Sequence, residues 1–164
     1  MTIKTFQNYA LCCFAIVCLL SCNKRADYYN TLLQVESQIE ENPQEALTTL
    51  QQIDTDNLSG RRTRAKYSLL YSIALDKNYI DTTDVEILQP AIAYYSKKGT
   101  PTDKLKTLYY QGRIYYNRGD EAQAMEYYLN ALEKGEKSND ILTKARIYVS
   151  QGTIYNQLYE FEKF

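Results

Sequence analysis

A five-residue motif that recurs after 40 residues constrains this chain more than any other feature. The sequence reads QGRIY at 111–115 and QGTIY at 151–155. Forty residues further back, the segment 68–79 falls in the same register, and the small residue Ser72 stands at the place of the glycine. Self-similarity at a fixed period is typical of repeat proteins, whose units bury their apolar surface only by stacking on one another. The chain is therefore expected to build its core from stacked units.

The pattern of apolar residues between the three prolines predicts helix nearly throughout. No clear period-two alternation is flanked by Asn-Gly or Asp-Gly turns, so strand signals are weak. Pro43 and Pro101 lie in polar turns and suit the start of a helix, whereas Pro90 should kink its helix or mark its first turn. Short connections are typical of antiparallel helix pairs. The expected helices cover about 27–41, 43–53, 60–78, 84–97, 101–117, 121–135 and 139–158.

Two helix starts carry residues that are typical N-caps. Asn42 precedes Pro43, and Asp120 precedes the segment EAQAMEYY. The side-chain oxygen of Asn or Asp can accept a hydrogen bond from a backbone N–H that has no partner inside the helix. We therefore expect both side chains to cap their helices.

The segment 105–138 carries a large, a small and an aromatic residue on one helix, then a small, an aromatic and a small residue on the next. These residues are Leu108, Gly112 and Tyr115, then Ala124, Tyr128 and Ala131, with Gly119 in the turn between them. They resemble the hallmark positions of the tetratricopeptide repeat (TPR), and the spacing of 40 is similar to longer-helix TPR variants of bacterial regulators. The resemblance implies an all-α, antiparallel helix-pair solenoid over 27–164.

That solenoid is expected to hold about three to four repeats, of which the last is truncated. Tyr148, Gly152 and Tyr155 open a further unit, but its second helix is missing before Phe164. Terminal repeats normally need a polar capping helix. We expect the chain to be the N-terminal part of a longer protein, or to form a homodimer through its uncapped C-terminal helix.

The N-terminal segment has the features of a secretory signal. Residues 1–8 carry one lysine, and an apolar run then leads to LLSC at 19–22. This run is shorter than the roughly 20 residues of a membrane-spanning helix; a short anchor helix is the alternative interpretation. LLSC resembles a bacterial lipobox, which implies a lipoprotein signal peptide at 1–21, lipidation of Cys22 and a tether at 22–26. The implied location is the bacterial cell envelope, at the outer membrane or the periplasmic face of the inner membrane.

The chain contains 17 tyrosines, many of them in adjacent pairs. Tyr115, Tyr128 and Tyr155 are interpreted as packing residues with hydroxyls at the edge of the core. In TPR arrays the first helices of the units line a concave groove that holds a peptide or a partner helix. By that resemblance the groove residues here are Lys106, Tyr109, Arg113, Tyr116, Asn117, Arg146, Val149, Thr153 and Asn156. An ordinary solvated face is the alternative interpretation of this set.

Composition argues against several classes of function. The chain has no His, all four Cys lie at or before Cys22, and the formal net charge is −1. A nucleic-acid partner is not expected, because no basic face stands out. Neither a metal nor another cofactor is expected, and no motif of an enzyme is present. The favoured function is a membrane-anchored scaffold or sensory module that binds a protein or peptide; the alternative is a glycan- or small-ligand-binding surface lipoprotein, against which the absence of Trp argues.

Overall fold

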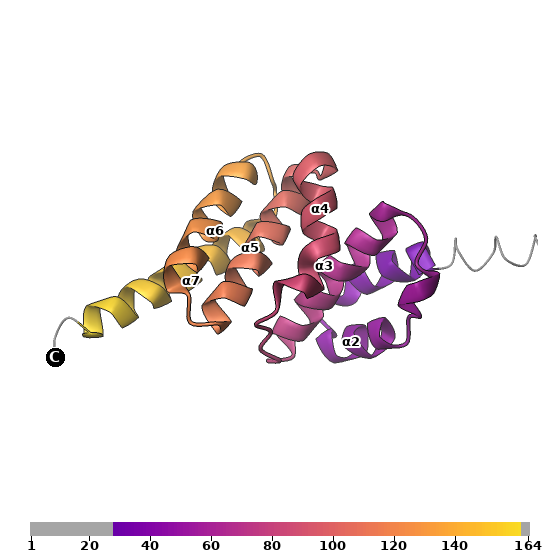
Figure 1. Ribbon diagram of the computed structural model, residues 1–164, viewed down its shortest axis with the longest axis horizontal. Helices are drawn as coiled ribbons and strands as arrows, with labels where there is room; N and C mark the ends of the chain where they lie inside the picture. The colour runs from indigo at the N-terminus through magenta and orange to yellow at the C-terminus, as the bar shows by residue number, and fades with distance from the viewer. Residues whose placement is uncertain (1–27, 162–164) are drawn as a thin grey trace, which may run out of the picture.

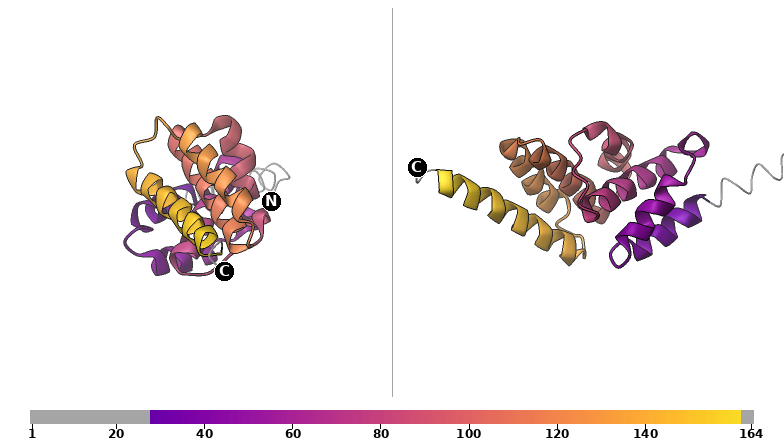
Figure 2. Two further views of the ribbon diagram at one scale, coloured as in Figure 1. Left: turned by 90° about the vertical axis from the view of Figure 1, so that its left-hand side faces the viewer. Right: turned by 90° about the horizontal axis from the view of Figure 1, so that it is seen from below.

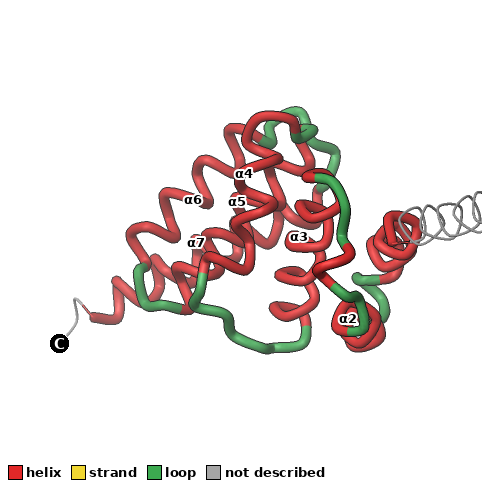
Figure 3. Tube along the Cα trace, turned by 45° about the vertical axis from the view of Figure 1, so that its right-hand side comes forward, coloured by secondary structure: helices red, strands yellow, loops and turns green. Residues whose placement is uncertain are grey.

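The computed structural model describes residues 28–161, and this part of the chain is all-helical without a strand (Figure 3). The expected signal peptide (1–21), the tether (22–26) and Cys22 lie outside the described residues. The all-α class is therefore confirmed for the part that the structure describes. Its helices are residues 28–38, α2 (Pro43–Gln51), α3 (Arg61–Lys77), α4 (Gln89–Lys98), α5 (Pro101–Asn117), α6 (Glu121–Lys134) and α7 (Ile141–Phe161), with short 3-10 helices at Thr55–Asn57 and Val85–Leu88.

The 40-residue period of the sequence is the spacing between the starts of three helices. The helices α3, α5 and α7 begin at Arg61, Pro101 and Ile141, and α3 and α5 each contain 17 residues. The connections between them differ, because residues 78–88 separate α3 from α4 whereas only residues 118–120 separate α5 from α6. The period thus describes the placement of these helices rather than equal loops.

The helices follow one another along the long axis of the molecule (Figure 1). Each of α2 to α6 packs on the next helix, and α5 also contacts α3 and α7 directly. Seen from below, the array is bowed (Figure 2). The bow brings α7 back toward the turn after the first helix, where Arg146 donates two hydrogen bonds to Glu40. Helices far apart in the sequence therefore share one inner face.

Close approach between α5 and α6 depends on a glycine. A Cβ placed on Gly112 would lie 2.5 Å from Cε1 of Tyr128 and 3.2 Å from the carbonyl oxygen of Ala124. Ala124, Tyr128 and Ala131 are fully buried. Gly112 therefore faces α6. Because a glycine leaves room there, the Tyr128 ring fills the space that a side chain would otherwise occupy.

The expected packing roles of the tyrosines hold for only part of the set. The Tyr128 ring is buried as expected, but its hydroxyl is buried as well and does not lie at the edge of the core. Burial raises the pKa of Tyr128 to about 12. Tyr115 is half-buried and stacks on Tyr127, with ring centroids 5.1 Å apart. For Tyr155 the expectation was wrong, because 64% of this residue is exposed. No described helix covers this face of α7, and Gly152 also has no neighbour within 4 Å of an added Cβ.

The expected helix caps are confirmed at one start and wrong at the other. Asp120 accepts a hydrogen bond from the backbone N–H of Gln123 at 3.0 Å, as expected. Asn42 precedes α2, but its side chain makes no capping hydrogen bond. The start of α5 carries a full capping box, in which Thr100 and Asp103 each bond the other's backbone N–H. Pro90 lies in the first turn of α4, one of its two expected positions.

Candidate functional site

A hollow of about 510 Å³ opens between α5 and α7 on the inner face of the array. We call it the α5–α7 hollow. Side chains of α5 and α7 line most of it, and the end of α3 completes it. The lining residues are Asp76, Tyr79, Tyr109, Arg113, Tyr116, Leu142, Ala145, Arg146, Val149, Ser150 and Thr153.

Helical periodicity explains why these residues meet. Tyr109, Arg113 and Tyr116 stand four and three residues apart, so they lie on one face of α5. On α7, Val149 and Thr153 occupy the places 40 residues after Tyr109 and Arg113. Equivalent faces of two neighbouring repeats therefore form the two walls of the hollow.

Six of the nine residues expected in a groove line this hollow: Tyr109, Arg113, Tyr116, Arg146, Val149 and Thr153. The other three do not line it. Lys106 lies 3.5 Å from Asp140, at the start of α7. Asn117 donates to the carbonyl oxygen of Thr82 at 3.3 Å and so holds the connection after α3. Asn156 is exposed on α7.

Arg113 is fixed at the wall by an ion pair with α3. Its Nε donates to Oδ1 of Asp76 at 2.8 Å, and its guanidinium lies 5.6 Å from the centre of the Tyr116 ring. The Tyr116 hydroxyl in turn accepts a hydrogen bond from Nε2 of Gln157 at 3.1 Å. The charge of Arg113 is therefore already balanced, and the arrangement holds the Tyr116 ring in place between α5 and α7.

Arg146 closes the hollow on its other side. Its two terminal nitrogens donate to Glu40 at 3.1 and 2.7 Å, and Lys77 contacts the same carboxylate at 2.6 Å. The hydrogen bonds from Arg146 contribute most to lowering the pKa of Glu40 to about 2; burial opposes this change, and Lys77 adds to it. Glu40 thus stays ionised and joins the first helix, α3 and α7 across the inner face.

Tyr79 stands at the rim of the hollow in an unusual backbone conformation. Its φ of 58° makes it the one non-glycine residue with positive φ among the described residues, and 94% of it is exposed. Its place in the repeat is that of Gly119, which has φ of 83° and lies 40 residues later. Both residues follow the end of a helix, where Ile80 N–H bonds the Leu75 carbonyl and Asp120 N–H bonds the Tyr115 carbonyl.

Left-handed backbone at this place favours glycine, because a Cβ adds steric strain. A tyrosine here puts a large aromatic ring into solvent beside the hollow.

Sequence reasoning missed Tyr79 and Asp76, although the 40-residue alignment of Tyr79 with Gly119 contained the signal for the former. Asp76 carried no such signal, because its role depends on the contact between α3 and α5.

The rest of the described chain offers no site for a metal ion. Residues 28–161 contain no group of three or more His, Cys, Asp or Glu side chains that would hold one. Among the same residues, no helix combines the length and apolar character needed to cross a membrane.

Comparisons with protein-family models, with curated proteins and with solved structures find no match to this chain.

Proposed function

We propose that this protein is a lipid-anchored, TPR-like interaction module that binds a segment of a partner protein in the α5–α7 hollow. The observation that carries the proposal is Tyr79, a strained and almost fully exposed tyrosine at the rim of a hollow with aromatic and arginine walls. Residues with strained backbone conformations cluster at functional sites. Tyrosine and arginine are enriched among the residues that dominate the binding energy of protein interfaces.

The order of the helices supports a repeat of the TPR type. Helix starts recur at intervals of 40 residues, and α5 contacts the helices at the same place in the units before and after it. Gly112 receives the ring of Tyr128, which are two of the hallmark positions. In such an array the first helices of successive units line the inner face, as α3, α5 and α7 do at the hollow.

The chemistry of the hollow favours a peptide over a highly charged ligand. Arg113 and Arg146 are paired with Asp76 and Glu40, so both charges are largely neutralised. What the hollow offers to a partner is the rings of Tyr79 and Tyr116, the apolar side chain of Val149 and polar groups around them. We expect an extended or helical segment that places an apolar side chain between α5 and α7.

The anchor in this proposal is the lipidated Cys22. Acyl chains stabilise membrane attachment by about 0.8 kcal/mol per buried CH₂ group. With the described helices beginning six residues later, at Tyr28, the module would lie close to the membrane surface. A partner would then be bound at the membrane of the cell envelope.

Two substitutions test the lipid anchor and the α5–α7 hollow independently of each other. Cys22→Ser should release the protein from the membrane fraction and remove the mass of the acyl chains in mass spectrometry. Tyr79→Gly should leave the protein on the membrane but reduce the partner that copurifies with it. Retention of Cys22→Ser on membranes would contradict the anchor, and an unchanged partner yield from Tyr79→Gly would contradict the role of the hollow.

The alternative function, binding of a glycan or another small ligand, predicts a different result. An oligosaccharide that occupies the hollow would raise the midpoint of thermal unfolding, because any ligand that binds only the folded state stabilises it. We expect no reproducible shift across an oligosaccharide set. A shift that Tyr116→Ala removes would favour the glycan-binding function instead.

We also propose a second copy of the chain as a partner for α7. Ile141, Tyr148 and Tyr155 follow at intervals of seven residues and are 79%, 62% and 64% exposed, so they form one apolar stripe. Gly152 lies between Tyr148 and Tyr155 and would let a second helix approach closely. An antiparallel pair of α7 helices crossing at Gly152 would place Tyr148 of one copy beside Tyr155 of the other, as a two-fold interface requires.

A further inference from the structure

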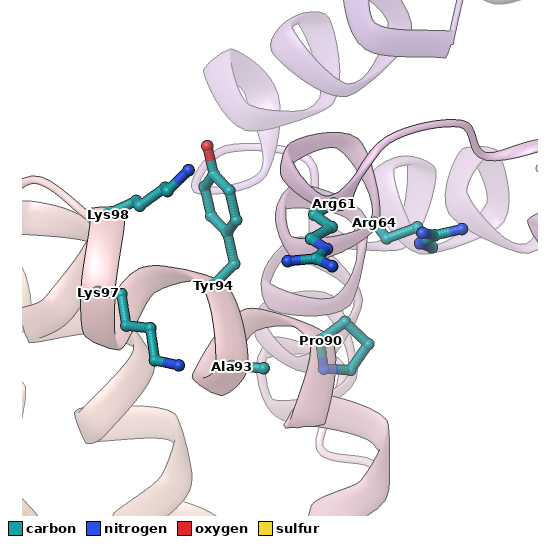
Figure 4. A pocket seen from close by; sticks show the side chains of 7 residues that line it. All are labelled: Arg61, Arg64, Pro90, Ala93, Tyr94, Lys97 and Lys98. Carbon is teal, nitrogen blue, oxygen red and sulfur yellow. The ribbon is translucent and has the colours of Figure 1, made fainter.

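A second cavity, of about 380 Å³, lies between the start of α3 and α4, apart from the α5–α7 hollow. We call it the α3–α4 cavity. Four of its seven lining residues are cationic, and none is acidic. The lining residues are Arg61, Arg64, Pro90, Ala93, Tyr94, Lys97 and Lys98. Figure 4 shows Tyr94 between Arg61 and Lys98, with Pro90 and Ala93 below, while Arg64 turns away from the ring.

These four cations are not balanced by carboxylates of the part of the chain that the structure describes. None of them takes part in an ion pair there; Arg64 donates only a long hydrogen bond, of 3.4 Å, to the carbonyl oxygen of Leu58. The inner face differs, because Arg113 and Arg146 each contact a carboxylate. Since the formal net charge of the whole chain is −1, the cluster is a local feature and not part of a general excess.

Helix stability does not account for the arginines. The first turn of α3 contains Arg61, Arg62 and Arg64, and no acidic residue. The positive end of the helix dipole lies there, where a cation is unfavourable. Lys97 and Lys98 at the end of α4 are favourably placed, but the antiparallel packing of α3 and α4 sets them against the arginines. Bringing these like charges together therefore costs free energy, and no ion pair with a carboxylate of the described part of the chain offsets this cost.

We propose that the α3–α4 cavity binds a phosphate group. A guanidinium presents a fork of donors that matches two phosphate oxygens, and lysine ammonium groups add point charges. Arg61 and Lys98 stand on either side of Tyr94, whose hydroxyl is a further donor, and the floor of Pro90 and Ala93 is apolar. The phosphate group can belong to free inorganic phosphate or to the headgroup of an anionic phospholipid.

The position of the cavity relates it to the membrane. The guanidinium of Arg62 lies 5.2 Å from the centre of the Tyr29 ring, so the start of α3 lies against the start of the first helix. Tyr28 follows Cys22 by only six positions, which span at most about 20 Å when extended. The headgroup source, though not phosphate binding itself, rests on the proposed lipid anchor. An anchored protein would then hold this end of the molecule near the lipid surface, where cations add to attachment.

Calorimetric titration of the full chain in a neutral detergent tests the proposal. The probes are inorganic phosphate, a short-chain phosphatidylglycerol and, as a lipid without a phosphate group, a short-chain diacylglycerol. We expect phosphate or phosphatidylglycerol to bind, and the double substitution Arg61→Gln with Lys98→Gln to weaken binding roughly tenfold or more, since each charge-assisted hydrogen bond contributes strongly. Tighter binding of phosphatidylglycerol than of phosphate assigns the headgroup as the source, and equal affinities assign the phosphate group alone.

The control is a pair with the same change of charge at another place. Lys134→Gln with Lys137→Gln removes two exposed cations, one at the last residue of α6 and one in the turn that follows, and should leave the affinity unchanged. Cys22→Ser should also leave it unchanged, so loss of the anchor does not imply loss of the cavity. No binding of phosphate or phosphatidylglycerol at millimolar concentration would overturn the proposal. Equal weakening in both double variants, or equal binding of the diacylglycerol, would overturn it too.

Discussion

Two residues at the same place in successive repeats, Tyr79 and Gly119, show how a local cost in stability points to function. Both have left-handed backbone after a helix, but only Tyr79 carries a Cβ. Steric strain for such a residue costs on the order of 1 kcal/mol or more. The exposed ring gains little from packing, because 94% of the residue faces solvent. The chain therefore keeps a strained tyrosine where a glycine would suit the fold better.

Replacing Tyr79 with glycine should stabilise the protein while weakening partner binding. We expect the free energy of unfolding to rise by about 0.5–1 kcal/mol in Tyr79→Gly, because the strain disappears. Gly119→Ala introduces the same strain and should lower it by about 1 kcal/mol. Urea unfolding of both variants measures the difference. A Tyr79→Gly variant less stable than the wild type would contradict the functional interpretation of this residue.

The two glycines of the recurring motif should respond in opposite directions to alanine. In Gly112→Ala the new Cβ would lie 2.5 Å from the Tyr128 ring, whereas in Gly152→Ala it would have no neighbour within 4 Å. We expect Gly112→Ala to lower the free energy of unfolding by about 1–3 kcal/mol through overpacking. Gly152→Ala should raise it by up to about 1 kcal/mol through helix propensity. Chemical denaturation distinguishes them, and a similar loss in both would mean that a helix already covers α7 in solution.

At the scale of single helices, the contact between Glu40 and Arg146 ties the first helix to the last. The pKa of Glu40 falls from 4.5 to about 2 on folding, so the folded state favours the ionised form. A carboxyl group with a lowered pKa stabilises the fold above pH 4.5, and this stabilisation is lost as the pH falls toward 2. The inner face is therefore expected to loosen in acid.

Removing the charge of Glu40 tests this dependence. At neutral pH, Glu40→Gln should lower the free energy of unfolding by about 1 kcal/mol, a value kept small because the pair is partly exposed to solvent. The difference from the wild type should shrink as the pH is lowered from 5 toward 2. Glu41→Gln, at the next residue, provides the control, since no ion pair involves Glu41 among the described residues. A difference that grows in acid would contradict the assignment.

Helix starts provide a second comparison at this scale. Thr100 takes part in a capping box at the start of α5, whereas Asn42 precedes α2 without a side-chain cap. Thr100→Ala should therefore lower the free energy of unfolding by about 1 kcal/mol, and Asn42→Ala by a few tenths at most. Thermal unfolding of the two variants measures the contrast. Equal losses would show that Asn42 caps its helix in solution.

For the whole molecule, the sequence predicted the class and most helix ends to within about three residues, because both depend on local patterns. The exception is the helix expected to begin at 84, since α4 begins at Gln89 after the 3-10 helix Val85–Leu88. The 40-residue recurrence of QG-IY predicted where α5 and α7 align, and six of the nine groove residues implied by the TPR resemblance line the α5–α7 hollow. Contacts between distant elements were not accessible in this way. The hydrogen bond of Asn117 to Thr82 and the pairing of Glu40 with Arg146 join residues 35 and 106 positions apart, and no local pattern specifies them.

The exposed stripe on α7 predicts self-association. Sedimentation velocity of the full chain in neutral detergent should detect a dimer that dissociates on dilution, because apolar area buried between two α7 helices drives the association. Tyr148→Lys with Tyr155→Lys should give a folded monomer. Leu129→Lys, at an exposed leucine on α6, should leave the dimer intact. A wild-type chain that stays monomeric at all concentrations would contradict the α7 interface.

Site-specific photo-crosslinking in living cells tests most directly whether the α5–α7 hollow binds a partner. Val149, which lines the hollow and is 70% exposed, is replaced by the photo-reactive residue benzoylphenylalanine; Leu129, outside the hollow on α6, is replaced in the control. We predict one discrete adduct from position 149, none of the same mass from position 129, and loss of the adduct when Tyr79→Gly is added. The same adduct from both positions, or an adduct from position 149 that Tyr79→Gly leaves unchanged, would contradict the account.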